Sequence, residues 1–428
     1  MPDATSYQLD GFEPSRVETP GSVDELSRTL ANAHISGEAV VLWGGGTRMH
    51  VGNRVSRYDV AVDMTGLSQL IEYRPSDLVV IAEAGITIAE LQARLAESGQ
   101  RLAFDPPLPG TATLGGSMAS NAVGALRSSF GGIRDLVLGM TVVQADGVVT
   151  KSGGKVVKNV TGYDLAKMHI GALGTLGAIA SVALRVGPLP ESSRTVAAWF
   201  GSFSQASYAT MSIYNANFDP EALCLLSGPR AEKMARQLAT DTGVEAPANP
   251  HLLIARVSGR PRSVERQAEE IESIVGGAMA DGFNVLDGES QESVWALAED
   301  ADDTPDLTIR ATFKPTEAFN FINRLRRRMS SGMSLDTVFH AGFGTVVAHW
   351  RETTGRVTDS DLTGLATFAR EQASEFRVMP VVERCPLNVK SALDVFGDPG
   401  ASLAVMKGLK QQFDPDYTLS PGRFIGGI

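Results

Sequence analysis

Glycine clusters that follow short apolar segments constrain this chain more than any other feature of its sequence. Gly44-Gly45-Gly46-Thr47 comes directly after the apolar run 39–43, and residues 106–124 form the longest glycine-bearing stretch. Glycines permit turns that Cβ atoms would block, so that several backbone N–H groups converge on one anion. A single GGGT is equally typical of a Gly-rich hairpin. Two such loops within 190 residues favour a pyrophosphate or similar anion.

The first glycine loop does not fit the Rossmann pattern. That pattern is G-x-G-x-x-G at the start of a helix, with an acidic residue about 20 positions later. The residues after Gly46, from Thr47 to Ser56, lack the apolar period of a helix. The sequence therefore argues against NAD and indicates another dinucleotide-binding fold.

Length and local patterns predict an α+β chain of more than one domain. With 428 residues, two to three domains are expected. We predict a first domain at 1–190, a second at 191–410, and a C-terminal tail at 411–428 that returns to the first. The first contains helical patterns at 22–37 and 87–99 and strands at 39–43, 59–64 and 78–85. In the second, strands at 195–200, 222–228, 251–259, 306–314, 336–350 and 377–383 alternate with helices at 204–216, 231–243, 264–277, 316–329 and 362–376. We expect an antiparallel sheet covered by helices on one side.

Charge and cysteine content exclude several classes of partner and cofactor. The net charge is −11, and no basic run of five residues occurs, which argues against a nucleic-acid partner. The two cysteines, Cys224 and Cys385, cannot form a Cys-rich zinc or iron–sulfur site and fit a reducing compartment. No apolar run reaches the ~18 residues of a membrane span. We expect a cytoplasmic protein that reaches a membrane only through partners.

A third glycine segment makes the pattern specific. Residues 158–165 read KNVTGYDL and residues 169–179 read HIGALGTLGAI, and the tail reads FDPDYTLSPGRF. Together with GGGT and the stretch PGTATLGGSMASNAVG, this order resembles the FAD-binding family of the vanillyl-alcohol-oxidase type (PCMH type). More narrowly, it is similar to the smaller FAD-binding E subunits of glycolate oxidases. The resemblance implies a two-part PCMH-type FAD-binding domain followed by a ferredoxin-like α+β cap domain.

The resemblance also implies which residues would hold FAD. Gly44, Gly45, Gly46 and Thr47 would surround the pyrophosphate, and Gly174 and Ile179 would lie near the adenine. The flavin and ribityl chain would be lined by Pro109, Gly110, Thr111, Thr113, Gly115, Gly116, Ser120 and Asn121. Relatives that bind flavin covalently use a histidine at the position of Thr47, or a later cysteine. Because the position is Thr47 and residues 1–223 contain no cysteine, we expect non-covalent FAD.

The oxidation site is less clear from the sequence. Catalytic relatives carry H-x-G-x-G-N-x-H and Glu-His-Gly, which together hold a metal. Here His340 and both glycines match, but Val347 stands at the second histidine position and the next histidine is His349. We therefore predict no metal and leave the catalytic residues open. Weak candidates are His340, Arg310 and Arg384, and further polar groups are Lys314, Glu383, Lys390 and Arg423.

Three functions remain open from the sequence. The first is an FAD-binding subunit of a glycolate or other 2-hydroxy-acid oxidase complex. In that complex a larger FAD-linked subunit would perform most of the chemistry, and electrons from the oxidation would pass towards an iron–sulfur partner. The second is a stand-alone FAD-linked dehydrogenase for glycolate or D-lactate with His340 or His349 as base. The third is a scaffold subunit without redox activity, against which the intact glycine loops argue.

Overall fold

The computed structural model describes residues 3–154, 164–299, 304–328 and 332–428. The chain forms two compact units, and the first is discontinuous: 1–123, 131–189 and 390–428. The second comprises 124–130 and 190–389. Residues 390–410, which the sequence led us to place in the second domain, thus belong to the first unit. Most of the predicted KNVTGYDL segment, 158–163, lies outside the described residues.

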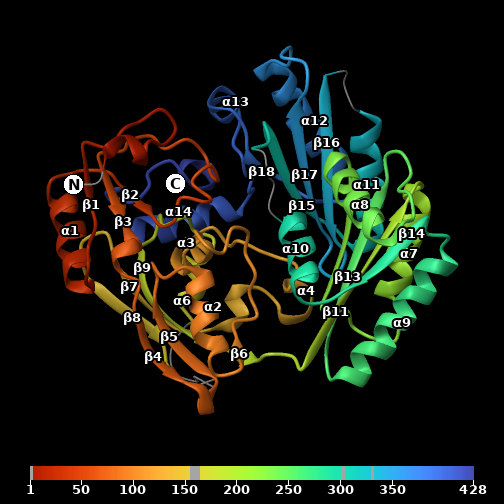
Figure 1. The fold of residues 1–428 in the computed structure, drawn as a ribbon. Coiled ribbons are helices and arrows are strands. Elements are labelled where there is room, and N and C mark those ends of the chain that lie inside the picture. The colour runs from red at the N-terminus through yellow and green to blue at the C-terminus, as the bar shows by residue number, and fades with distance from the viewer. Residues whose placement is uncertain (1–2, 155–163, 300–303, 329–331) are drawn as a thin grey trace. The chain divides into compact units, whose positions relative to one another are not determined.

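The first unit contains three small sheets and short helices (Figure 1). Its strands are β1 (Arg16–Glu18), β2 (Val40–Trp43), β3 (Val60–Asp63), β4 (Leu70–Arg74), β5 (Val79–Glu83), β6 (Gln100–Arg101), β7 (Val137–Val143), β8 (Val149–Gly153), β9 (Ala178–Arg185) and β10 (Gly187–Pro188). Its helices are α1 (Val23–Ile35), α2 (Ile88–Ala96), α3 (Leu114–Ala119), α5 (Ile133–Leu136), α6 (Ala166–His169) and α14 (Ser402–Phe413). Helix α13 (Leu387–Ala392) spans the boundary between the units.

Two of these sheets contain eight of the ten strands that the structure describes in the first unit. The order β1-β3-β2 is parallel, and the order β4-β5-β9-β7-β8 is antiparallel. Helix α1 forms where the sequence predicts it, with the Ser22 side chain accepting a hydrogen bond from the Glu25 N–H. Its buried face packs on β2 and β3 through Leu26 and Leu30. This packing fixes the end of β2, from which the GGGT loop leaves.

The C-terminal segment of the first unit is anchored by a buried ion pair. Lys410 and Asp414 are fully buried and lie 2.6 Å apart (Nζ to Oδ2). The Lys410 ammonium also donates to the carbonyl oxygens of Thr175 at 2.8 Å and Leu419 at 3.0 Å. Leu419 in turn forms a parallel bridge with Val40 at the start of β2. One ammonium thus joins α14, the tail and the loop before β9.

The second unit is built on one eight-stranded antiparallel sheet of order β14-β11-β13-β12-β16-β17-β15-β18. The strands are β11 (Ser192–Phe200), β12 (Ala222–Ser227), β13 (His251–Gly259), β14 (Gly282–Leu286), β15 (Leu307–Thr312), β16 (Met333–His340), β17 (Thr345–Glu352) and β18 (Val381–Arg384). The helices are α4 (Arg127–Phe130), α7 (Phe203–Tyr214), α8 (Pro229–Thr242), α9 (Pro261–Gly277), α10 (Gly288–Glu299), α11 (Pro315–Arg327) and α12 (Asp359–Ser374).

Helices cover both faces of this sheet, so the prediction of one covered face is wrong. On β13, Leu252 packs in one apolar cluster with Met234 and Leu238 of α8. The preceding residue, His251, contacts Phe203 of α7 with ring centroids 5.2 Å apart. Successive side chains of a strand point to opposite faces. The second face is buried because the strands are apolar at nearly every position, and not only at alternate ones.

The predicted strand 336–350 is two strands joined by a turn. β16 ends at His340, residues 341–344 turn, and β17 starts at Thr345. Gly344 has a φ of +71°, and a Cβ there would lie 1.9 Å from the Phe313 carbonyl oxygen. His340 and His349 therefore lie on neighbouring antiparallel strands, where they oppose Thr345 and Asp336 respectively. The expectation that they share one strand is wrong.

Across the described part of the chain, no helix combines the length and apolarity needed to cross a bilayer.

Removing the buried ammonium should destabilise the first unit strongly. Lys410→Met leaves the Asp414 carboxylate buried without its cation, and we expect the free energy of unfolding to fall by about 3–5 kcal/mol. Urea denaturation measures this change. Lys407→Met, an exposed position on the same helix, is the matched control and should change stability by less than about 0.5 kcal/mol. Equal effects of the two substitutions would contradict the anchoring role.

Candidate functional site

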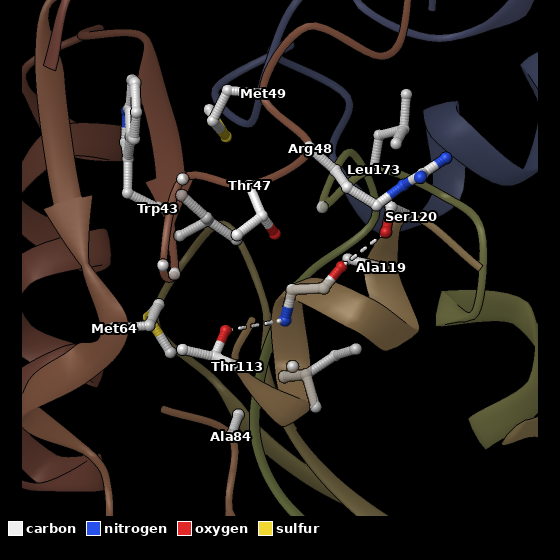
Figure 2. Close-up of a pocket in the computed structure, with 18 of the residues that line it drawn as sticks. Trp43, Thr47, Arg48, Met49, Met64, Ala84, Thr113, Ala119, Ser120 and Leu173 are labelled. Carbon is white, nitrogen blue, oxygen red and sulfur yellow. Dashed lines mark hydrogen bonds between the residues drawn. The ribbon is translucent and has the colours of Figure 1, made fainter. Parts of the chain in front are cut away.

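The glycine loops of the first unit meet at one pocket (Figure 2). Ten of the residues predicted for FAD line it: Gly44, Gly45, Gly46, Thr47, Thr113, Gly115, Gly116, Ser120, Gly174 and Ile179. The loop after β2, helix α3 with its two flanking residues, and the segment from Gly174 into β9 supply them. Four other predicted residues, Pro109, Gly110, Thr111 and Asn121, are not among the lining residues. Segments far apart in the sequence thus converge on one place.

Two glycines allow the loops to touch. A Cβ on Gly45 would lie 1.7 Å from the Thr111 carbonyl oxygen, and one on Gly44 would lie 2.2 Å from the Thr113 Oγ1. Real Cβ atoms do not approach so closely, so any side chain would push the loops apart. Among the described residues, the backbone N–H groups of Gly44–Thr47 donate no hydrogen bond to another protein group. They remain available to an anion in the pocket.

Hydrogen bonds hold the wall of the pocket that α3 forms. The Thr113 Oγ1 accepts from the Gly116 N–H at 3.2 Å, which caps α3, and the Ser120 hydroxyl donates to the Gly116 carbonyl oxygen at 2.8 Å (Figure 2). The Gly115 N–H donates to the Ala84 carbonyl oxygen at 2.7 Å. A Cβ on Gly115 would lie 2.7 Å from that of Ala84, so glycine lets α3 pack closely on the end of β5.

Sequence reasoning missed the apolar and cationic parts of the lining. These are Leu42, Trp43, Arg48, Met49, Met64, Ala84, Ala119, Leu173, Gly177 and Arg423. Figure 2 shows Trp43, Met49, Met64 and Leu173 around the pocket. An isolated methionine or leucine carries no local signal of such a role, because the same residues form ordinary cores.

Arg423 brings a buried positive charge to the pocket. Only 4% of it is exposed, and it donates to the carbonyl oxygens of Val51 at 3.3 Å and Met49 at 3.2 Å. Burial lowers the pKa of Arg423 to about 10, so the guanidinium still carries its proton at neutral pH. The sequence offered Arg423 only as a further polar candidate for the oxidation site. In the structure it lies with the glycine loops.

The structure does not gather the weak catalytic candidates into one group. Arg310 on β15 pairs with Glu383 on β18 at 2.6 Å (Nε to Oε1). Arg384 lies opposite Thr308 in the same strand pair. His340 is on β16, which β17 separates from β15. The pair between Arg310 and Glu383 has the form of a structural ion pair across two strands.

The other polar candidates also have local partners. Lys314 is exposed and lies 3.7 Å from the Glu317 carboxylate. Lys390 belongs to the first unit, where its ammonium contacts the Asp10 carboxylate at 2.9 Å and the His50 carbonyl oxygen at 3.1 Å. Neither residue is among those that line the glycine-loop pocket.

His340 lies in a small buried cluster. Its Nδ1 is 3.2 Å from the Cys224 Sγ and 3.8 Å from the Glu299 Oε1, and its ring stacks on Phe343 with centroids 5.0 Å apart. Thiolate, imidazole and carboxylate are all possible metal ligands. Burial and the nearby Arg127 guanidinium lower the pKa of His340 to about 4. The same cation disfavours a metal ion, and the absence of a metal remains a prediction.

The other histidine of the hairpin is held by a hydroxyl. His349 Nδ1 lies 3.0 Å from the Thr308 Oγ1. Burial, together with Arg230 and Arg351, lowers the pKa of His349 to about 3. Both hairpin histidines are therefore neutral at pH 7, and their low basicity makes each a poor general base at that pH.

Comparison with known proteins identifies both units. Residues 14–153 match the family described as FAD binding domain, and residues 189–349 match the C-terminal domain of FAD linked oxidases. The chain thus belongs to the FAD-linked oxidoreductases that carry a PCMH-type FAD-binding domain. The E-subunit resemblance is not decided by these matches.

Individual relatives give finer likenesses. Over 427 residues, 96% of this chain and 89% of the relative, it is 26% identical to glycolate oxidase subunit GlcD of Bacillus subtilis strain 168. Over 155 residues, 36% of this chain and 44% of the relative, it is 33% identical to glycolate oxidase subunit GlcE of Escherichia coli strain K12. The fold is similar to that of alkyldihydroxyacetonephosphate synthase, with a TM-score of 0.72 at 15% identity over 95% of this chain and 75% of that one.

A side chain that forces the glycine loops apart should weaken cofactor binding. Gly45→Ala places a methyl group against the Thr111 carbonyl oxygen, and we expect FAD affinity to fall at least about tenfold, or about 1.4 kcal/mol. Titration of the apoprotein with FAD, followed by flavin fluorescence, measures the loss. Gly187→Ala is the control, because nothing lies within 4 Å of the new Cβ. Unchanged affinity in Gly45→Ala would contradict the loop-contact argument.

Four histidines with lowered pKa values predict loss of stability in mild acid. Burial lowers the pKa to about 4 in His169, His251 and His340, and to about 3 in His349. The unfolded chain, with histidine pKa values near 6.5, binds these protons first. Stability therefore falls as the pH drops from about 6.5 to 4, by about 1.4 kcal/mol for each unit of pKa difference at each histidine.

Urea denaturation between pH 7.5 and 5 measures this dependence. His169→Leu removes one of the titrating groups and should reduce the steepness by about one proton. A free energy of unfolding that does not change between pH 6.5 and 5 would contradict the prediction.

Proposed function

We propose that this protein is a non-covalent FAD-binding subunit of a 2-hydroxy-acid oxidising complex. A larger FAD-linked subunit and an iron–sulfur subunit are the proposed partners, and glycolate is the leading substrate. The observation that carries the proposal is the pocket of glycine backbone and buried Arg423 in the first unit. Matches to two flavoprotein-oxidase families support it.

The residues present in the first unit fit FAD. The free N–H groups of Gly44–Thr47 suit a pyrophosphate, and the buried Arg423 cation offsets its negative charge. Met64, Trp43 and Leu173 offer apolar and aromatic surface to flat rings. No cysteine precedes Cys224, and Thr47 has no nucleophile of the kind that bonds flavin. Bound FAD supplies acceptance of a hydride from the carbon that bears the hydroxyl group.

The side chains of the second unit support an accessory role more than independent catalysis. A hydroxy-acid oxidation needs a base for the hydroxyl proton and a cation for the carboxylate. His340 and His349 are neutral groups of low basicity, and Arg310 is engaged by Glu383. With only two cysteines, this chain lacks the ligands for its own cluster. Onward electron transfer therefore depends on a partner in this proposal.

A stand-alone glycolate or D-lactate dehydrogenase is the second candidate. The observation that favours it is the similarity to D-lactate dehydrogenase of Archaeoglobus fulgidus, which is 28% identical over 265 residues, 59% of this chain and 58% of the relative. In this case His340, next to Cys224, would have to regain basicity when substrate binds. Direct reduction by substrate separates the two candidates.

Anaerobic titration of the purified yellow protein tests both candidates. We expect no bleaching of the flavin with glycolate or D-lactate alone, and rapid bleaching once the larger subunit is added. Acetate is the control, because it has the carboxylate but no hydroxyl group to oxidise. Bleaching by glycolate or D-lactate without a partner would overturn the accessory role and establish the stand-alone dehydrogenase. A colourless protein that takes up no FAD would overturn the cofactor assignment.

A further inference from the structure

Three buried polar side chains form a row across the sheet of the second unit. Ser227 on β12 lies directly opposite His251 on β13 and Thr337 on β16. At most 4% of each of the three is exposed. Two residues along, the same face carries the apolar trio Leu225, Leu253 and Phe339. Burying polar groups beside such a core costs free energy unless they have hydrogen-bond partners. The partners of these three side chains therefore have to be identified.

The hydrogen bonds of the row fix which way its protons point. Arg326 Nη2 lies 3.4 Å from the His251 Nε2, and a guanidinium can only donate. The Nε2 atom therefore accepts, and the proton of the neutral ring is on Nδ1. From there it is donated to the Ser227 Oγ at 2.8 Å. The Ser227 hydroxyl then has its own proton left to donate to a further acceptor.

Thr337 adds a second donor. Its Oγ1 is buried and has no hydrogen-bond partner among the described residues. A buried hydroxyl in this condition costs about 1–3 kcal/mol unless another molecule supplies the partner. The two hydroxyls lie side by side on neighbouring strands, since Ser227 and Thr337 are a directly opposed pair.

Ser227 and Thr337 are among the residues that line a cavity of about 580 Å³, and two arginines line it as well. Arg326, Arg327 and Asn323 of α11 line it, together with Asn249 just before β13. The single carboxylate among the lining residues is that of Glu232, which is paired with Arg236. The cavity therefore offers two guanidinium groups, two amides and the hydroxyls of Ser227, Thr337 and Ser334, a set rich in hydrogen-bond donors. Of these hydroxyls, that of Ser334 already lies 3.5 Å from the Arg351 carbonyl oxygen.

The start of α8 does not contribute to this set. The Arg230 N–H already donates to the Asp336 Oδ1 at 2.7 Å. The attraction for an anion thus rests on side chains of α11 and of the strands, and not on the helix terminus.

From this arrangement we infer that the cavity between α11 and the ends of β12, β13 and β16 binds a small oxyanion-bearing metabolite. Arg326 and Arg327 supply the charge, because guanidinium matches the geometry of phosphate and carboxylate. The Ser227 and Thr337 hydroxyls supply directed hydrogen bonds to the oxyanion. The cavity is large enough for an organic group beside the charged one. This site is made wholly from the second unit and is distinct from the glycine-loop pocket.

Calorimetric titration of the full-length, FAD-loaded protein tests the site. The probes are inorganic phosphate and glycolate, each at constant ionic strength, with chloride as the reference anion. We expect at least one of the two to bind and to raise the melting temperature. Binding of phosphate alone identifies a phosphorylated ligand, and binding of glycolate alone identifies a carboxylate. If neither anion binds beyond chloride, the inference is overturned.

Adjacent arginines provide a matched pair of variants. Arg327 lines the cavity and Arg328 does not, and both are exposed, so either change leaves the fold intact. Arg327→Gln should weaken binding about tenfold, and Arg328→Gln should leave it unchanged. Thr337→Val keeps the shape and removes one donor, so it should also weaken binding, while Glu232→Gln should strengthen it. Equal weakening in both arginine variants would show attraction to net charge only and would overturn the site.

Discussion

The buried pair of Lys410 and Asp414 is the interaction on which the first unit depends most. Its ammonium makes three contacts, to the carboxylate and to the carbonyl oxygens of Thr175 and Leu419. The carboxylate in turn accepts from the backbone N–H groups of Thr418 and Leu419. A buried charge pair is stable only when its remaining hydrogen-bonding capacity is met, as it is here. The pair thereby fixes the positions of the tail, the edge of β2 and the loop before β9 relative to one another around the pocket.

Local patterns in the sequence predicted the parts of the structure that local forces determine. The helix cap at Ser22, the short strands and the tight glycine turns each depend on neighbours a few residues away. Ten of the proposed cofactor residues meet at one pocket because each glycine loop is itself a local motif. The fold class followed for the same reason.

The remaining features depend on contacts that spacing does not reveal. Arg423 lies in the pocket because the tail crosses to the loop of Met49, more than 370 residues earlier in the chain. The hairpin between His340 and Thr345 depends on the close approach of Gly344 to Phe313. Helices cover both sheet faces because the strands are apolar on each side. Residue propensities alone do not reveal which helix packs on which face.

The division of the first unit into separate chain segments has a consequence for biosynthesis. Domains usually fold in the order in which the ribosome delivers them. Here β2 has to wait for Leu419, and the loop at Thr175 has to wait for Lys410, while all of 190–389 is translated in between. The second unit can therefore finish folding before the first unit does. The newly made glycine loops stay without their closing segment until almost the whole chain has been delivered, so cofactor capture is an event of the finished polypeptide.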